Sequence, residues 1–415
     1  MDYTTTPIPS HVLPTSSQLA YARSTLHSTL PTKGTGLSSL QQHLTNDISP
    51  GLNAASQSSR YYGFVTGGAL PASEYADNLV TQFDQNVQVH LPHETIATEV
   101  ENAALVMLCQ LLDLKPEDWN HRTFTTGATT SNILGLACGR ESVIAEAGKR
   151  VGERASVAEM GLMRAAKVAQ VDEVQILTTV PHSSIRKAAS VIGLGHASVK
   201  DVSRRGDAHR FDHVALEDAL KKPRTASIIM ISCAEVNTGL FATDGLEEMT
   251  RIRKLADQYG AWVHVDAAFG LLCRVLPDDE EFAFIKRGVE GLELADSITG
   301  DAHKLMNVVS LIFVGCRCPA NATLHPALRH RHLLFTPSTS RPNRLPEPRR
   351  ALSQHFTIKH SLTSEHRHRE LPTIPCIAGL REPCRLRQEW VRGHADTTNQ
   401  TCAAHCSISQ RFSMF

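Results

Sequence analysis

Apolar and polar positions follow two different periods along the middle of this chain. Between residues 97 and 300, short apolar stretches of strand length are separated by longer stretches in which apolar residues recur every three or four positions. The pattern predicts strands at 174–180, 197–203, 226–234, 261–268 and 295–300, and a strand, a polar turn and a helix within 121–150. Further helices are predicted over 97–114, 182–194, 213–222 and 244–260, the last closed by Gly260.

This alternation determines the expected fold class. Apolar strands that alternate with helices of about 10–15 residues indicate βαβ units around a mainly parallel sheet, which is an α/β fold. In such sheets ligands bind outside the carboxyl ends of the strands. Candidate chemistry is therefore expected where each strand passes into the loop that follows it.

The composition and the hydrophobic pattern of the sequence divide the chain into three parts. Residues 1–60 are rich in Ser, Thr and Pro and are expected to form an arm or linker. Residues 61–309 have the pattern of a globular enzyme domain. Residues 310–415 show little periodicity and hold 14 of the chain's arginines with only one lysine, so they are expected to be disordered.

Composition excludes several classes of protein. The polar start lacks the basic and apolar regions of a signal peptide, and no apolar run reaches the roughly 18 residues of a membrane span. Residues 1–309 hold four scattered cysteines, none at zinc-ligand spacing. We therefore expect a cytoplasmic protein with buried thiols, no metal site and no membrane partner.

Two of the predicted strand ends carry groups that suit a phosphate and a flat ring. Thr125 to Asn132 is a run of small and hydroxyl residues before a helix, where free N–H groups can hold a phosphate. His182, in "PHSS", begins the helix that follows the strand 174–180. Each signal alone would equally fit an ordinary helix cap.

Two further strand ends carry a carboxylate and an amine. Asp266 follows the apolar strand "AWVHV", where an unpartnered carboxylate would be costly to bury. Asp301, His303 and Lys304 follow "ADSITG". Burial disfavours the charged form of an amine, and a neutral lysine reacts with carbonyls to form Schiff bases. A capping Asp and a surface Lys are the alternatives at these positions.

The four strand ends together match the needs of one cofactor. A phosphate cradle, a flat group over an aromatic ring, a carboxylate for a ring nitrogen and an amine for an aldehyde are what pyridoxal 5′-phosphate requires. Asp266 would keep the ring nitrogen protonated, and Lys304 would bind the aldehyde.

The motifs "PHSSIRKAA", "HVDAAFG" and "DAHKLMN" resemble, in order and spacing, the group II pyridoxal-phosphate-dependent amino-acid decarboxylases. "YYGFVTGGALP" and "ATEVE" resemble the upstream segments of that family, so the resemblance covers roughly residues 35–309. It implies fold type I, the aminotransferase-like fold of the pyridoxal-phosphate-dependent transferases. It also implies a homodimer with sites at the subunit interface, and decarboxylation of an L-amino acid to its amine.

The resemblance assigns roles to individual residues. Lys304 would be the catalytic Schiff-base lysine, and His182 would stack on one ring face and take part in catalysis. The other expected cofactor contacts are Ala128 and Thr129 at the phosphate, His303 also at the phosphate, Asp266 at the ring nitrogen, Ala268 under the second ring face, and Asn237 near the cofactor.

The family pattern stops at the tail. Residues 1–309 hold 27 basic and 36 acidic residues, whereas residues 310–415 hold 15 and 6. The tail has no tyrosine, although the family uses one from a mobile loop to protonate the product. Because Val309-Ser310 can be encoded by a splice-donor sequence, we interpret the tail as a retained intron or frame disruption. The smaller C-terminal domain is then missing, and losing that much burial would impair folding or activity.

Several functions stay open on the sequence alone. Another fold type I enzyme, such as a lyase, desulfurase or aminotransferase, would need the same Lys304 and Asp266. A catalytically dead fragment that binds the cofactor is a second alternative, and a nucleic-acid-binding basic tail is a third, less favoured one. The specificity pocket is expected around 90–93, with aromatic amino acids favoured over glutamate as substrates.

Overall fold

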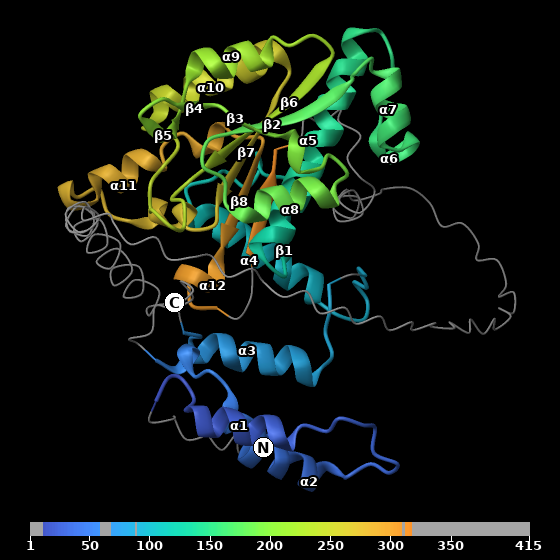
Figure 1. Ribbon diagram of the computed structural model, residues 1–415, viewed down its shortest axis with the longest axis vertical. Helices are drawn as coiled ribbons and strands as arrows, with labels where there is room; N and C mark the ends of the chain where they lie inside the picture. Colours follow the sequence, from blue (N-terminus) through green and yellow to red (C-terminus); the bar gives the residue numbers. More distant parts are fainter. Residues whose placement is uncertain (1–10, 59–67, 88, 309–311, 318–415) are drawn as a thin grey trace, which may run out of the picture. The chain divides into compact units, whose positions relative to one another are not determined.

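The structure is a computed structural model, and it describes residues 11–58, 68–87, 89–308 and 312–317. At its centre lies a seven-stranded sheet in the order β1-β9-β8-β7-β6-β2-β3 (Figure 1). The strands are β1 (His121–Thr125), β2 (Glu173–Thr178), β3 (Val199–Asp201), β6 (Thr225–Ser232), β7 (Trp262–Ala267), β8 (Ser297–Asp301) and β9 (Ile312–Cys316).

Five neighbouring strands of this sheet run in the same direction. β8, β7, β6, β2 and β3 pair in parallel, whereas β9 is antiparallel to both β8 and β1. Since β9 reverses direction between them, β1 runs the same way as the parallel strands. The carboxyl ends of β1, β2, β6, β7 and β8 therefore lie along one edge of the sheet.

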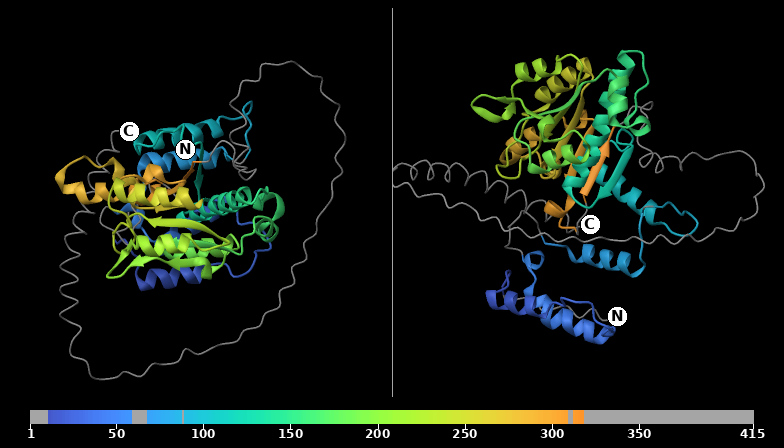
Figure 2. Two further views of the ribbon diagram at one scale, coloured as in Figure 1. Left: turned by 90° about the horizontal axis from the view of Figure 1, so that it is seen from above. Right: turned by 45° about the vertical axis from the view of Figure 1, so that its right-hand side comes forward.

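Helices cover both faces of the sheet, as Figures 1 and 2 show. Alternate residues of β6 divide between two apolar clusters: Ile228 and Met230 pack with α5 and α8, whereas Ile229 and Ile231 pack with α4, α9 and α10. Both faces of β6 are buried, and for this reason its sequence is a continuous apolar run. The helices of this part are α4 (Ala97–Leu111), α5 (Ala128–Arg150), α6 (Val157–Met160), α7 (Leu162–Val168), α8 (Ser183–Val191), α9 (His213–Leu220), α10 (Leu246–Tyr259), α11 (Ala283–Gly288) and α12 (Ala302–Leu305).

The N-terminal part, expected to be an arm or linker, contains short helices. None of α1 (Ser16–Thr25), α2 (Leu37–Gln42) or α3 (Pro71–Gln82) buries a residue. Short helical turns complete the described residues: η1 (His43–Ile48), η2 (Ser49–Gly51), η3 (Ala55–Gln57), η5 (His196–Ser198), η6 (Gly270–Val275), η7 (Glu280–Phe282) and η8 (Leu292–Leu294).

Two predicted elements differ from the structure. The single strand expected at 197–203 is divided at Val202, whose N–H donates to the Thr178 carbonyl and whose side chain is buried. β3 ends before it, and β4 (Ser203–Arg204) forms a separate antiparallel hairpin with β5 (Asp207–Phe211). The helix expected over 97–114 ends at Leu111, because Asp113 adopts a left-handed conformation.

The sheet also continues beyond residue 309, where we placed the end of the enzyme domain. β9 fills the position between β1 and β8, so five residues of the segment set aside as aberrant belong to the sheet. Residues 318–415, the rest of that segment, lie outside the described residues. Gly260, expected to close the helix over 244–260, does so with a φ of 68°.

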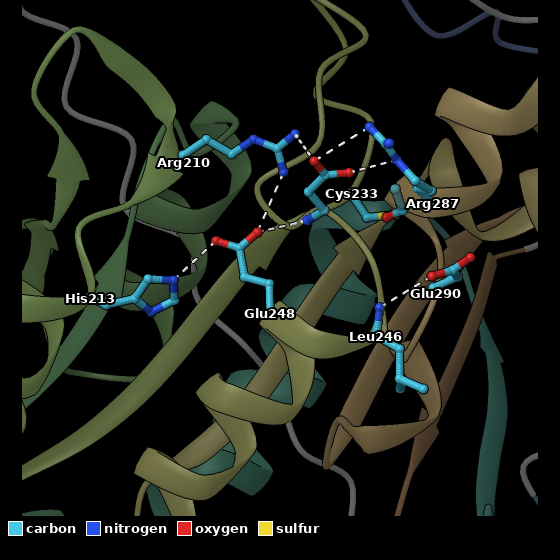
Figure 3. A network of polar contacts seen from close by, with 9 residues as sticks. Arg210, His213, Cys233, Leu246, Glu248, Arg287 and Glu290 are labelled. Atoms are coloured by element: carbon cyan, nitrogen blue, oxygen red, sulfur yellow. Dashed lines mark hydrogen bonds and ion pairs between the residues drawn. The ribbon is translucent and has the colours of Figure 1, made fainter.

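A polar network joins four elements at one side of the domain (Figure 3). Glu248 of α10 accepts a hydrogen bond from the Asp244 N–H at 2.7 Å and lies 3.1 Å from His213 Nε2 and 3.6 Å from an Arg210 guanidinium nitrogen. Arg287 of α11 pairs with Asp244 at 3.0 Å. These contacts tie the β4–β5 hairpin and α9 to the start of α10.

The cysteines expected to be buried are largely so within the described residues. Cys109, Cys138 and Cys233 are buried free thiols, and Cys273 is partly buried. No helix in the described part of the chain is both long and apolar enough to cross a membrane.

Candidate active site

Lys304 lies on α12, immediately after the carboxyl end of β8. Its ammonium nitrogen stands 4.0 Å from the centre of the Phe269 ring and 3.5 Å from Asp301 Oδ2. Phe269 belongs to the loop after β7, so two neighbouring strand ends meet at this lysine. Both contacts stabilise a positive charge on the amine.

Asp266 sits in β7 beside Thr299 of β8 in the register of the sheet. Its Oδ2 accepts a hydrogen bond from Asn132 Nδ2 at 2.8 Å, and its Oδ1 accepts one from the Ala268 N–H at 3.3 Å. The carboxylate keeps part of its surface exposed, yet the surrounding protein desolvates it.

Burial raises the pKa of Asp266 above its ordinary value. The hydrogen bonds from Asn132 and Ala268 and the charge of Lys304 act in the opposite direction without cancelling the effect of burial. Lys304, Asp266 and His182 all lie toward the edge of the sheet where the parallel strands have their carboxyl ends. Hydrogen-bond distances through Asn132 and Ser184 join Asp266 to the His182 cap. A cation at the free side of this carboxylate would restore the ionised form.

His182 is the N-cap of α8, and its ring is exposed. Its Nδ1 accepts a hydrogen bond from the Ser184 N–H at 3.2 Å and lies 2.9 Å from Ser184 Oγ. An Nδ1 that accepts belongs to the neutral tautomer whose proton is on Nε2. The cap reading and the ring-face reading of His182 are therefore compatible, because capping uses only one of the two nitrogens.

The start of α5 has the features of a phosphate site. Gly127 precedes the helix in an extended conformation, no side chain caps the first turn, and open space surrounds the position of a Cβ at Gly127. The hydroxyl of Thr125 lies 2.7 Å from that of Ser131, which leaves the N–H groups of Ala128 and Thr129 uncapped by these side chains. An anion is the natural partner of such a helix start.

His303 and Asn237 have different surroundings from those expected. His303 Nδ1 lies 2.6 Å from Asp301 Oδ1, although the orientation is not that of a hydrogen bond. Asn237 is exposed in the loop after β6, and its N–H and amide donate to Glu235 at 3.1 and 2.7 Å. Among the described residues, no hydrogen bond or ion pair joins Asn237 to the other candidates, so its expected place near the cofactor stays a prediction.

Sequence reasoning assigned no role to three residues that the site uses. Asn132 and Ser184 are buried and connect Asp266 with the His182 cap, since Asn132 Nδ2 also lies 3.2 Å from Ser184 Oγ. Phe269 carries the aromatic ring below Lys304. Asn132 follows the small-residue run and Phe269 directly follows Ala268, so adjacency to the motifs was the only available signal.

These residues fit pyridoxal 5′-phosphate by their chemistry. An uncapped helix start suits the phosphate, and the buried carboxylate Asp266 suits a protonated ring nitrogen. Lys304 supplies a primary amine on the neighbouring strand end. The described residues contain no cluster of His, Cys, Asp and Glu that would hold a metal ion.

The sequence comparison decides the family. A family model described as the pyridoxal-dependent decarboxylase conserved domain matches residues 20–316. The chain belongs to this family. The resemblance inferred from the motifs is thus confirmed, and the match continues through β9. The expected cofactor, pyridoxal 5′-phosphate, is that of the family.

Relatives with assigned names are similar over part of their length. The chain is 30% identical over 183 residues to an L-2,4-diaminobutyrate decarboxylase of Acinetobacter baumannii, covering 44% of this chain and 34% of the relative. It is 24% identical to tyrosine/DOPA decarboxylase 2 of Papaver somniferum, covering 72% of this chain and 51% of the relative. The chain thus spans about half the length or less of these relatives.

Solved structures share the fold. The Oryza sativa TDC structure with PLP and tryptamine matches with a TM-score of 0.57 at 20% identity, covering 74% of this chain and 61% of that chain. Mouse CSAD matches with a TM-score of 0.58 at 19% identity, covering 75% and 60%. The predicted α/β fold of type I, with its mainly parallel sheet, is confirmed. The expectation that the small C-terminal domain is missing concerns residues outside those described.

Proposed function

We propose that this chain carries the cofactor-binding half of a pyridoxal-phosphate-dependent enzyme that decarboxylates an L-amino acid to its amine. The observation that carries the proposal is the placement of Lys304, Asp266 and His182 at one edge of the sheet, with Asn132 and Ser184 joining Asp266 to the His182 cap. Membership of the decarboxylase family supports the choice of decarboxylation over the other reactions of this fold.

Each residue of the site has a defined task in this proposal. Lys304 would bind the cofactor aldehyde, and Asp266 would accept a hydrogen bond from the protonated ring nitrogen. The N–H groups of Ala128 and Thr129 would hold the phosphate, with His303 nearby. His182 lies on one ring face and Ala268 on the other. When bound, pyridoxal 5′-phosphate supplies an electron-accepting ring for the bonding electrons left by the departing carboxylate.

The surroundings of Lys304 provide a place for its proton. An amine must give up a proton before it can react with an aldehyde. Asp301 Oδ2 lies 3.5 Å from the amine, and Asp301 is almost completely buried. Asp301 is therefore placed to accept this proton.

Assembly and location are also part of the proposal. Large apolar side chains are exposed on and around α3 and α4, among them Tyr75, Phe83, Ile96 and Met107 at 60% or more. Apolar surface of this kind supports a homodimer. Sedimentation of the purified chain tests this directly. A cytoplasmic location stays a prediction that rests on free thiols, and cell fractionation tests it.

The function is tested by incubating the full chain with pyridoxal 5′-phosphate and a panel of L-amino acids. The names of the relatives direct the panel toward 2,4-diaminobutyrate, tyrosine, tryptophan and aspartate, with glutamate added. Release of CO2 with formation of the amine supports the proposal. Release of a keto acid without CO2 would instead identify an aminotransferase on the same fold.

A second candidate is binding of the cofactor without turnover. It is favoured because the candidate residues are all assigned to parts of the cofactor, and none is assigned to the side chain of a substrate. Visible absorbance of the bound cofactor, with no product from any member of the panel, would establish this alternative.

A further inference from the structure

Asn132 occupies a completely buried position at the second turn of α5 and touches two elements of the site at once. Its Nδ2 lies 2.8 Å from Asp266 Oδ2 and 3.2 Å from Ser184 Oγ, and its Oδ1 lies 3.0 Å from His264 Nε2. Both donors and the acceptor of this buried amide therefore have hydrogen-bond partners. These contacts connect Asn132 with Asp266 and His264 of β7 and, through Ser184, with the His182 cap.

The chain of hydrogen bonds continues below Asn132 to a second buried pair. His264 Nδ1 lies 2.8 Å from Ser297 Oγ, and Trp262 Nε1 donates to the same oxygen at 2.8 Å. Burial lowers the pKa of His264 to about 3, so its ring is neutral and carries one proton. The tautomer of this ring determines which atom donates in each hydrogen bond that the ring makes.

Trp262 and Asp266, at the two ends of this series of hydrogen bonds, are consistent with the same direction of donation. An indole N–H can only donate, and an ionised carboxylate can only accept. Because the carboxylate accepts from Asn132 Nδ2, Asn132 Oδ1 faces His264 and accepts from its Nε2–H. The other nitrogen, Nδ1, then accepts from the Ser297 hydroxyl, and the Ser297 oxygen can still accept from the Trp262 N–H. The Asn132 amide hydrogens then point to Asp266 and Ser184. The reversed amide would place an oxygen against the Asp266 carboxylate, where the two acceptors repel.

Glycines on α5 leave space for the side chains of this hydrogen-bond network. A Cβ at Gly135 would meet His264 Cε1 at 2.4 Å, and a Cβ at Gly139 would meet Trp262 Cδ1 at 2.8 Å. Asn132, Gly135 and Gly139 stand three and four residues apart, so they lie on the same face of the helix. The helix is therefore shaped to receive both rings directly below the amide.

We propose that Asn132 is a positioning residue of the active site, whose amide is oriented by Trp262, Ser297 and His264 and which holds the Asp266 carboxylate toward the cofactor ring. Through Ser184 the same amide supports the Nδ1-accepting form of His182. The inference rests on the proposed function, because Asp266 has this task only when a pyridinium nitrogen faces it. The orientation of the amide, however, is a property of the protein without cofactor.

The first test measures the tautomer of His264 in the full chain before cofactor is added. Nitrogen-15 NMR of histidine-labelled protein separates a protonated Nε2 from a protonated Nδ1, and the His264 signal is identified by its loss in His264→Gln. We expect protonated Nε2, unchanged between pH 5 and pH 8. A protonated Nδ1 would reverse the direction of these hydrogen bonds and would overturn the proposal.

The second test measures the dissociation constant of pyridoxal 5′-phosphate by its absorbance. Asn132→Ala removes a hydrogen bond to a charged group, and we expect about 10- to 100-fold weaker binding than in the wild type at each pH. The matched control is Gln175→Ala, which removes another completely buried amide, one that donates to the Ala219 carbonyl and Ser227 Oγ. The control is expected to bind within about twofold of the wild type.

Asn132→Asp separates positioning from a merely structural role. Two adjacent carboxylates share one proton as the pH falls, and the shared proton recreates a donor toward Asp266. The other ionisable groups that act on Asp266 are Lys304, His182 and Cys233, and all three are unchanged in the variant. Relative to wild type at the same pH, we expect Asn132→Asp to bind weakly at pH 8 and to recover at pH 5.5, whereas Asn132→Ala does not recover.

The outcomes distinguish this inference from the proposed function. If the wild type binds no pyridoxal 5′-phosphate, the proposed function fails and the tautomer of His264 alone decides the inference. If the wild type binds it while both Asn132 variants bind equally well, the function stands and the inference is overturned. Equal weakening by Gln175→Ala, or an Asn132→Asp ratio that does not change with pH, also overturns it.

Discussion

The ammonium of Lys304 lies 4.0 Å from the centre of the Phe269 ring, and this contact joins the ends of two neighbouring strands. Lys304 follows β8, and Phe269 follows β7 two residues after its last residue, Ala267. A cation over an aromatic face gains about 0.5–2 kcal/mol. The contact therefore holds the reactive amine beside the strand that carries Asp266 before any cofactor is present.

Lys304→Ala is expected to abolish the visible absorbance of the lysine-bound cofactor and to lower CO2 release by at least about 10³-fold. The reason is that Lys304 is the lysine that α12 places at this strand end in the part of the chain that the structure describes. Absorbance spectroscopy of the purified variant with added cofactor measures the first effect, and a CO2 assay measures the second.

Lys254→Ala is the matched control for this variant, because Lys254 is an exposed lysine of α10. It is expected to keep both the absorbance and the rate of the wild type. Retention of the absorbance in Lys304→Ala would mean that another amine binds the aldehyde.

Asp266→Asn is expected to lower turnover by about 10²- to 10³-fold without destabilising the unliganded protein. The amide has the same shape but no charge to keep a ring nitrogen protonated. Because burial raises the pKa of Asp266, the ionised form is costly to the fold, and removing its charge relieves that cost. Urea unfolding gives the stability, and CO2 release gives the rate.

Asp212→Asn provides the control for the change of side chain. Asp212 caps α9 by accepting hydrogen bonds from the N–H groups of Val214 and Ala215, and asparagine caps equally well. Both its stability and its rate should match those of the wild type. A large loss of stability in Asp266→Asn would show that the carboxylate has a structural task instead.

The parallel sheet was predictable because its signal is local. Each of β2, β6 and β7 is a short apolar run bounded by helices of clear period, and the structure places all three within about two residues of the prediction. β9 was missed for a different reason. Its apolar residues begin a stretch whose basic, cysteine-rich composition dominates the pattern, and only pairing with β1 and β8 identifies it as a strand.

The site was predictable as far as strand ends determine it. Asp266, Lys304 and His182 each directly follow or end a strand, so parallel topology alone brings them to one edge. Asn132 could not be assigned in this way. It meets Asp266 across 134 positions of sequence, and no local period or spacing reports a hydrogen bond between a helix face and a strand end.

His264 makes stability sensitive to acid. Burial lowers its pKa from 6.5 to about 3, so the unfolded chain binds a proton that the folded chain does not. The stability from this group is complete above about pH 6.5 and is lost as the pH falls toward 3, by on the order of 5 kcal/mol in all. Urea unfolding at pH 7.0 and pH 5.0 should show the wild type losing more stability than His264→Gln, whereas His196→Gln, at an exposed position, should follow the wild type.

Gly135→Ala is expected to destabilise the chain by about 1–3 kcal/mol, because its Cβ would meet the His264 ring at 2.4 Å within a packed core. Gly127→Ala, at the start of the same helix, meets nothing within 4 Å and adopts an extended φ of 178°, so its stability should change by less than about 0.5 kcal/mol. Thermal unfolding of the two variants compares them directly. Equal stabilities would show that α5 can move away from His264 at no cost.

Glu248 is expected to be the residue on which the network in Figure 3 depends most. Glu248→Ala leaves the Arg210 guanidinium and the His213 ring, both largely buried, without their shared carboxylate, at a cost of about 3 kcal/mol. Burial alone would raise the pKa of Glu248, but the hydrogen bonds from His213 and the Asp244 N–H and the charge of Arg210 outweigh it and leave that pKa below its ordinary value.

The sign of the pH effect at Glu248 follows from that lowered pKa. A carboxylate of this kind stabilises the fold above its unfolded pKa of 4.5 and loses the contribution as the pH falls through its folded value. The stability difference between wild type and Glu248→Gln should therefore be largest near neutral pH and shrink below about pH 4.5. Urea unfolding of both proteins at pH 7 and pH 4 measures it. A difference that stays constant would mean that packing, and not charge, holds the β4–β5 hairpin and α9 against α10.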